Sequence, residues 1–133
     1  MNPKNFFLVP GMAEKTELIV TEEQTARYWG SGKSDILATP ALVAVMEATT
    51  QKITDGGLPE SWQSVGTYIG LTHSSVTPVG AKVSIHAVLT HIDGKELTFE
   101  ISAFDESGII AEGSHKRIIS RTEVLKRLLR KKK

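Results

Sequence analysis

Three side chains in this sequence have chemistry suited to proton transfer or to attack on a carbonyl group: Thr39, Glu47 and His73. Glu47 lies inside the apolar run LVAVMEA at residues 42–48, where a carboxylate loses its solvation unless a partner compensates for it. Such a carboxylate is either a functional group or a structural hydrogen-bond anchor, and the sequence context leaves both open. In a helix, Thr39 would lie two turns earlier, about 12 Å from Glu47 along the axis, and taken alone it is typical of an N-cap.

His73 follows an alternating segment and is flanked by hydroxyl residues in LTHSS at 71–75. An unperturbed imidazole titrates at about pH 6.5, so His73 can accept a proton near neutral pH and return it. Three further histidines occur, at positions 86, 91 and 115, and a single histidine is most often an ordinary hydrogen-bonded side chain. No two histidines have metal-ligand spacing on a helix and the HExxH pattern is absent, so we expect no metal site.

The composition narrows the chemistry and the setting. The chain has no cysteine, which excludes disulfides and thiolate nucleophiles, so its chemistry must use oxygen or imidazole groups. Its 133 residues fit one domain, and 40% hydrophobic and 23% charged residues are typical of a globular protein. The apolar patch at residues 6–9 is too short for a signal-peptide core, and we expect a cytoplasmic protein. A net charge of +1 provides no field for nucleic acid or an anionic membrane, and we expect neither partner.

The strongest helix signal covers residues 39–55. Thr39 can cap this segment, Pro40 occupies the first turn, where its missing N–H has no cost, and Gly56 and Gly57 follow its end. The first half of the segment is apolar on every side. This pattern is typical of a helix that is surrounded by protein.

Strand signals dominate the rest of the chain. Residues 13–21 alternate in part and are followed by TEEQ at 21–24, which has the capping-box spacing of a short helix. Four β-branched, alternating segments come after the long helix: 65–72, 81–92, 97–105 and 109–120. Asp93-Gly94 predicts a tight hairpin turn between two of them. Together these elements predict an α+β domain in which an antiparallel sheet wraps around a central helix, the hotdog arrangement.

The last segment, residues 121–133, is predicted to be a short amphipathic helix with a basic tail. Its cations are Lys126, Arg127, Arg130, Lys131, Lys132 and Lys133. Such a cluster either meets a phosphate-bearing ligand or is a solvated terminus, and terminal charge runs are usually the latter. We therefore expect a single domain over residues 1–133, with its core at about 13–121 and this basic helix and tail at 121–133.

Three segments resemble fluoroacetyl-CoA thioesterases, a family with the hotdog fold. The most specific is VGTYIGLTHSSVTPVG at residues 65–80. ATPALVAVME at 38–47 is similar to the family's central helix, and GSHKR at 113–117 is similar to a motif in its last strand. The resemblance covers roughly residues 13–121. It implies hydrolysis of a small acyl-CoA thioester, with no cofactor other than the coenzyme A of the substrate. The sheet edges left by such a fold are often paired across a dimer axis, so we expect a homodimer; pairing of dimers into a tetramer is left open by the sequence.

The resemblance also implies roles for particular residues. In that family a threonine at the helix start, a glutamate eight residues later and a histidine twenty-six beyond that form the catalytic set, and Thr39, Glu47 and His73 have both spacings. Gly66 would lie beside the acyl group, and Arg117 matches an arginine near the active site. The alternatives are a strand glycine that permits close backbone approach and a surface strand residue.

One departure from the family concerns the loop before the central helix. The fluoroacetyl-specific enzymes have phenylalanines there that close over the acyl group, whereas residues 30–35 here contain none. The resemblance therefore implies the general chemistry and leaves the substrate open. Two other functions remain as alternatives: a hotdog protein that binds acyl-CoA or a small ligand without turnover, and an interaction protein that uses its basic C-terminal segment.

Overall fold

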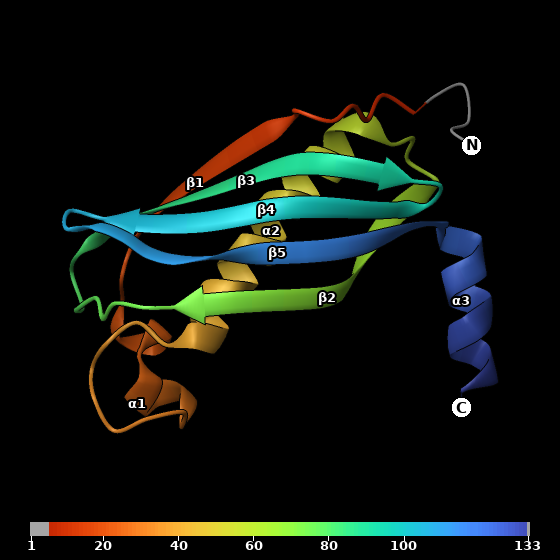
Figure 1. Ribbon diagram of the computed structural model, residues 1–133. Coiled ribbons are helices and arrows are strands. Elements are labelled where there is room, and N and C mark those ends of the chain that lie inside the picture. The colour runs from red at the N-terminus through yellow and green to blue at the C-terminus, as the bar shows by residue number, and fades with distance from the viewer. Residues whose placement is uncertain (1–5, 133) are drawn as a thin grey trace.

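The computed structural model describes residues 6–132 (Figure 1). The strands and both longer helices expected from the sequence are present, and the short helix after Thr21 is a single 3-10 turn. Residues 1–5 and Lys133, the last residue of the basic tail, lie outside the described residues. The elements in chain order are β1 (Ala13–Ile19), the 3-10 turn (Glu22–Gln24), α1 (Ala26–Trp29), α2 (Thr39–Gly57), β2 (Trp62–His73), β3 (Lys82–Asp93), β4 (Glu96–Asp105), β5 (Gly108–Arg121) and α3 (Thr122–Lys131).

The strands form one antiparallel sheet in the order β1-β3-β4-β5-β2. Two tight hairpins join β3 to β4 and β4 to β5, and Gly94 and Gly108 occupy them with φ angles of 60° and 119°. These angles favour glycine because a Cβ atom would be strained there. The long connections place β1 and β2 at the two edges, so within residues 6–132 each edge strand has one side without a partner strand.

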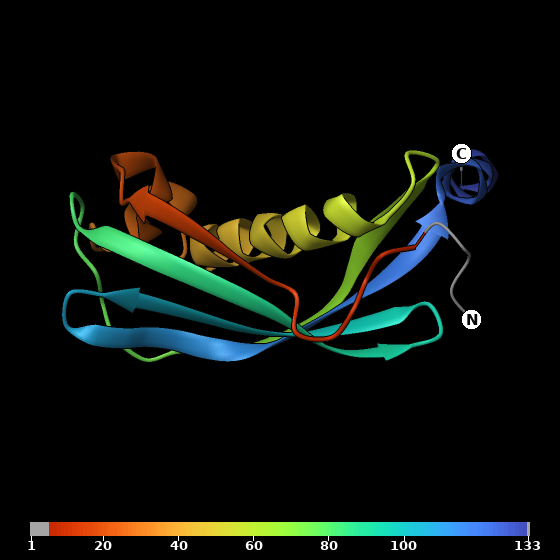
Figure 2. The same ribbon diagram turned by 90° about the horizontal axis from the view of Figure 1, so that it is seen from above.

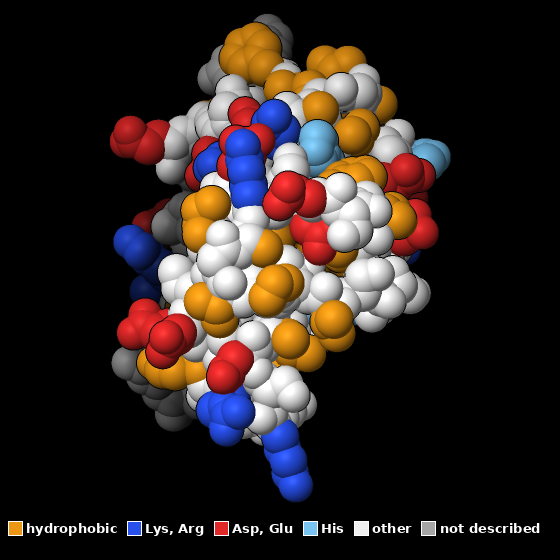
Figure 3. Space-filling model, turned by 90° about the vertical axis from the view of Figure 1, so that its left-hand side faces the viewer, with side chains coloured by type: hydrophobic (Ala, Val, Ile, Leu, Met, Phe, Trp, Pro, Cys, Tyr) orange, Lys and Arg blue, Asp and Glu red, His pale blue; other side chains and the backbone are white. Residues whose placement is uncertain are grey.

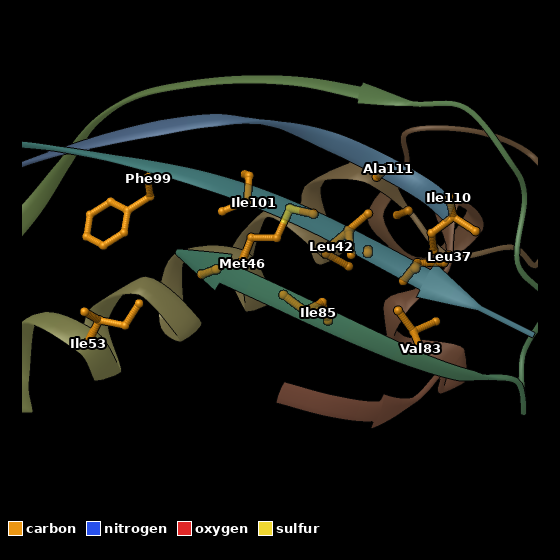
Figure 4. Close-up of a cluster of buried hydrophobic side chains, with 14 of the residues drawn as sticks. Leu37, Leu42, Met46, Ile53, Val83, Ile85, Phe99, Ile101, Ile110 and Ala111 are labelled. Carbon is orange, nitrogen blue, oxygen red and sulfur yellow. The ribbon is translucent and has the colours of Figure 1, made fainter. Parts of the chain in front are cut away.

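Helix α2 lies across the concave face of the curved sheet (Figure 2). Leu42 and Met46 are fully buried between this helix and the strands, where they lie near Ile85 and Ile101 (Figure 4). Inward positions of β3 and β4 alternate with outward ones, which gives the sheet one apolar face. The core is therefore a single layer between one helix and one sheet.

The sheet covers only one side of α2. Ala44 and Ala48 are exposed and Val43 and Glu47 are half-buried, although the sequence predicted a helix surrounded by protein. The difference has a physical reason, because a five-stranded sheet can enclose one face of a helix and leaves the opposite face open. An apolar helix face thus remains uncovered in the single chain.

Helix α3 stands apart from this core. None of its residues is buried, and Leu128 and Leu129 are 52% and 64% exposed. It begins beside the start of β2, where the backbone N–H of Thr122 donates to the carbonyl oxygen of Ser61 at 2.9 Å. None of the helices within residues 6–132 is both long enough and apolar enough to cross a membrane.

Candidate active site

Thr39 and His73 meet where α2 begins and β2 ends. Thr39 Oγ1 lies 2.8 Å from His73 Nδ1, at hydrogen-bonding distance. The N-cap of α2 is Ala38, so Thr39 is the first helical residue and not the cap that its position in the sequence predicted. Its hydroxyl group binds the imidazole instead, which joins two elements that are far apart in the sequence.

The Thr39–His73 pair lines an open cavity of about 520 Å³. One wall comes from residues 31–34, the segment before α2, and contributes two serines, a glycine and Lys33. The opposite wall continues from His73 through Ser74, Ser75 and Val76. No phenylalanine, tyrosine or tryptophan lines the cavity among the described residues, which agrees with the absence of phenylalanine from residues 30–35.

His73 has one nitrogen free for chemistry. Thr39 occupies Nδ1, whereas Nε2 is the one buried side-chain nitrogen or oxygen within residues 6–132 that has no hydrogen-bond partner. Burial lowers the pKa of His73 below its ordinary value of 6.5, and the nearby backbone of Ser75 partly opposes this shift. The imidazole is therefore neutral at pH 7, as a proton acceptor must be.

Glu47 belongs to a second cluster, around Gly66 of β2. A Cβ atom added to Gly66 would lie 2.7 Å from Glu47 Oε2 and 3.2 Å from His115 Cε1. The carboxylate of Glu47 thus packs against the β2 backbone at a place where a side chain would collide with it. This contact coincides with an irregularity in the β2–β5 pairing. Gly66 pairs with Arg117 and Tyr68 with Lys116, so Thr67 has no paired residue opposite it in β5.

Arg117 lies beneath this contact and is 5% exposed, so it is not the surface strand residue of the alternative interpretation. Its guanidinium group donates to Ser64 Oγ at 2.8 Å, to the Ser64 carbonyl oxygen at 3.2 Å and, more weakly, to Thr50 Oγ1 at 3.4 Å. None of the ion pairs among the described residues involves it. Burial lowers the pKa of Arg117, and the negative charges of Glu47 and Asp55 oppose this shift.

His115 also belongs to this cluster, although the sequence predicted it to be one ordinary histidine among four. It is 1% exposed, with Nδ1 at 2.7 Å from the carbonyl oxygen of Tyr68 and Nε2 at 3.1 Å from Arg117 Nη1. Because a carbonyl only accepts and a guanidinium only donates, Nδ1 carries the hydrogen and Nε2 accepts. Burial lowers the pKa of His115, the hydrogen bond to Tyr68 opposes the shift, and the charge of Arg117 adds to it.

The two clusters lie apart within one chain. The seven steps from Gly66 to His73 span about 23 Å of β2, at ~3.3 Å per residue. Along α2, Thr39 and Glu47 are separated by about 12 Å. The structure therefore brings Thr39 to His73, and Glu47 to Gly66 and Arg117, but it does not bring the three expected catalytic residues together in a single copy of the chain.

Comparisons with known proteins agree on one group. The family described as fluoroacetyl-CoA-specific thioesterase (FlK) matches residues 20–123. The fluoroacetyl-CoA thioesterase of Streptantibioticus cattleyicolor is 31% identical over 98 residues, which are 74% of this chain and 70% of that protein. A solved structure of the fluoroacetyl-CoA thioesterase FlK superposes with a TM-score of 0.87 at 26% identity, covering 96% of this chain and 98% of that one. A thioesterase superfamily member from Thermus thermophilus also gives a TM-score of 0.87 at 26% identity, covering 98% and 94%.

The first prediction concerns His115. Replacing it with phenylalanine (His115→Phe) keeps an aromatic ring but leaves a buried Arg117 N–H without its acceptor, so the free energy of unfolding should fall by about 1–3 kcal/mol. The matched control is His91→Phe, at an exposed position of β3, where the change should stay within about 0.5 kcal/mol. Urea denaturation measures both, and equal losses in the two variants would contradict a structural role for the His115 hydrogen bonds.

The second prediction concerns the protonation of His73. Because burial disfavours the imidazolium form, we expect His73 to titrate below 6.5. Following the imidazole carbon and proton signals by NMR against pH gives the pKa, and the His73→Gln variant identifies the signal by its disappearance. A measured pKa at or above 6.5 would show that an unrecognised negative charge outweighs the burial.

Proposed function

Since this chain belongs to the family of fluoroacetyl-CoA-specific thioesterases, we infer that it is a thioester hydrolase that cleaves an acyl-CoA to a free acid and coenzyme A. The observation that carries this function is the family match, which extends over residues 20–123. The fold is consistent with it, because solved fluoroacetyl-CoA thioesterases superpose on nearly the whole chain.

We assign to Glu47 the reaction at the carbonyl carbon of the substrate. Its carboxylate either attacks this carbon, giving an acyl-enzyme that water then hydrolyses, or removes a proton from water as the water attacks. In both routes a C–O bond forms, the C–S bond breaks and the thiolate takes a proton to leave as coenzyme A. The missing side chain at Gly66 supports this role, since it lets the carboxylate lie directly against the β2 backbone, where a Cβ atom would be 2.7 Å from Glu47 Oε2.

His73 and Thr39 serve the proton transfers. The free Nε2 of a neutral His73 can accept a proton during attack and deliver it to the departing thiolate, while Thr39 holds the ring through Nδ1. The start of α2 adds unpaired backbone N–H groups and the positive end of the helix dipole. These groups are suited to stabilising the oxyanion of the tetrahedral intermediate.

A homodimer would unite the two clusters. Edge strand β2 has an open side and carries Val65 and Tyr68 at 40% and 53% exposure, and the uncovered face of α2 lies beside it. Both features favour pairing of β2 with β2 of a second copy. A two-fold axis near Ile69 sets His73 of one copy opposite residues 65–66 of the other, because such an axis pairs positions that lie equally far on either side of it. The Glu47 carboxylate of the second copy then approaches the Thr39–His73 pair.

The acyl specificity follows from the wall formed by residues 31–34. This wall has hydroxyl groups and Lys33 where the fluoroacetyl-specific enzymes are expected to have phenyl rings. Residues 31–34 therefore have no phenyl ring that could close over the acyl group. A small acyl group other than fluoroacetyl is the substrate that we propose.

The test is thiol release from short, branched, aromatic and fluorinated acyl-CoAs by the wild type and by Glu47→Gln and His73→Ala. We expect release from at least one small acyl-CoA and a loss of kcat/KM of about 10²-fold or more in each variant. Glu100→Gln is the matched control, since it removes a carboxylate that is exposed on β4, and it should retain the wild-type rate.

Two outcomes would contradict these assignments. No thiol release from any acyl-CoA, together with a higher Tm in the presence of these esters, would indicate a binding protein without turnover. Release that survives in the Glu47→Gln variant would remove Glu47 from the mechanism while leaving the hydrolase activity in place.

A further inference from the structure

The basic face of α3 has no role in the site described so far. The helix carries four exposed cations and a single acidic residue, Glu123. None of the ion pairs among the described residues involves an α3 side chain. The four cations are Lys126, Arg127, Arg130 and Lys131. Since like charges on one helix repel, an anion nearby would stabilise this arrangement.

The position of α3 in the fold is fixed by the start of β2. Besides the backbone bond from Thr122 to Ser61, Gln63 Nε2 donates to Thr122 Oγ1 at 3.0 Å. From this anchor α3 runs past the edge strand β2, at the end of the sheet opposite to α1 (Figure 1). Helices α1, α2 and α3 all lie on the same side of the sheet (Figure 2).

In a dimer whose two β2 strands pair antiparallel, the strands run in opposite directions. The start of β2 in one copy, with α3 attached to it, comes beside the end of β2 in the other copy, with its Thr39–His73 cavity. With the two-fold axis near Ile69, Val65 of one copy lies opposite His73, the last residue of β2 in the other copy. Trp62, and with it the α3 that follows the neighbouring strand β5, therefore lies beyond that strand end, towards the cavity that His73 lines. The axis is perpendicular to the sheet, so α3 stays on the side of the sheet that carries α2 of the second copy.

The chain's own surface at the cavity end offers no concentrated positive charge. Acidic and basic side chains are interspersed with hydrophobic ones on the face that includes this end (Figure 3). Lys33 is the one cation among the residues that line the cavity. An acyl-CoA, however, carries a diphosphate and a 3′-phosphate on the part of the molecule that must extend out of the cavity.

We propose that the cations of α3 in one copy bind the phosphate groups of the acyl-CoA whose acyl end occupies the cavity of the other copy. This inference rests on the proposed function and on the β2–β2 dimer. Lysine and arginine form short, charge-assisted hydrogen bonds to phosphate, and on an exposed helix these contacts weaken as salt is added. The α3 cations thus contribute to affinity for the coenzyme and leave the chemical step to the residues of α2 and β2.

The experiment compares one acyl group on two carriers, coenzyme A and pantetheine, which ends in the same thiol but has no phosphate. The variant combines Arg127→Gln, Arg130→Gln and Lys131→Gln. We expect its KM for the acyl-CoA to rise about tenfold or more, with kcat retained, and its kcat/KM for the acyl-pantetheine to stay unchanged. Unchanged turnover of the pantetheine ester also reports that the dimeric site is intact.

The matched control removes three cations from other surfaces, by Lys15→Gln, Lys52→Gln and Lys82→Gln. This control variant has the same change in net charge and should keep the wild-type KM for acyl-CoA. If both triple variants raise this KM equally, or if neither does, the proposed phosphate contact is wrong. An equal rise in KM for the two carriers in the α3 variant would also overturn it.

A binding measurement separates this inference from the proposed function. The Kd of free coenzyme A, measured by calorimetry, should rise about tenfold or more in the α3 variant. Added salt should raise the Kd of the wild type more steeply than that of the variant, which lacks the salt-sensitive contacts. An unchanged Kd would reject the role of α3 even if the enzyme hydrolyses acyl-CoA. A raised Kd in a protein that releases no thiol would uphold the phosphate site and reject the hydrolase activity.

Discussion

The contact between the Glu47 carboxylate and the backbone at Gly66 is the constraint on which the arrangement of this molecule depends. A carboxylate in the apolar part of α2 needs polar surroundings, and the sheet supplies them through the charge of Arg117 beneath it. Arg117 is held in turn by Ser64 and by His115, and His115 also binds the β2 backbone at Tyr68. The helix, the strand irregularity and the buried polar network therefore form one unit.

The second constraint is the length of α2. Its first residue is Thr39, which hydrogen-bonds to His73, and Glu47 lies in its middle, about 12 Å away along the axis. A single copy thus has two polar clusters at separate points of one edge strand, together with an apolar helix face that its own sheet does not cover. The proposed dimerisation through β2 would bury that face and bring the cluster of Glu47 in one copy near the Thr39–His73 pair of the other.

Much of this architecture could be predicted from the sequence, because the signals are local. Period-two alternation predicts the strands, Asp93-Gly94 predicts a hairpin, and the pattern around Pro40 predicts the start of α2. The hydroxyl of Thr39 shows the limit of local signals. Its residue type predicts a cap, but the structure gives the hydroxyl a partner 34 positions away and leaves the cap to Ala38.

The hydrogen bonds of His115 are tertiary contacts, and no local pattern predicts which atoms they join. The alternation of β5 did contain a signal, since residues 111, 115, 117 and 119 all face the core, and this places an imidazole and a guanidinium group in an apolar layer. Two neighbouring polar groups at inward positions predict a buried network, although not which atoms meet.

The most direct test of this account is to mix two inactive variants, Glu47→Gln and His73→Ala, under conditions in which the subunits exchange. When equal amounts are mixed, half of the dimers contain one copy of each variant. If Glu47 of one copy acts with His73 of the other, each of these mixed dimers has one intact site. The rate of acyl-CoA hydrolysis should then recover to about a quarter of the wild-type rate. A rate that stays at the level of the separate variants would contradict a site shared between two copies.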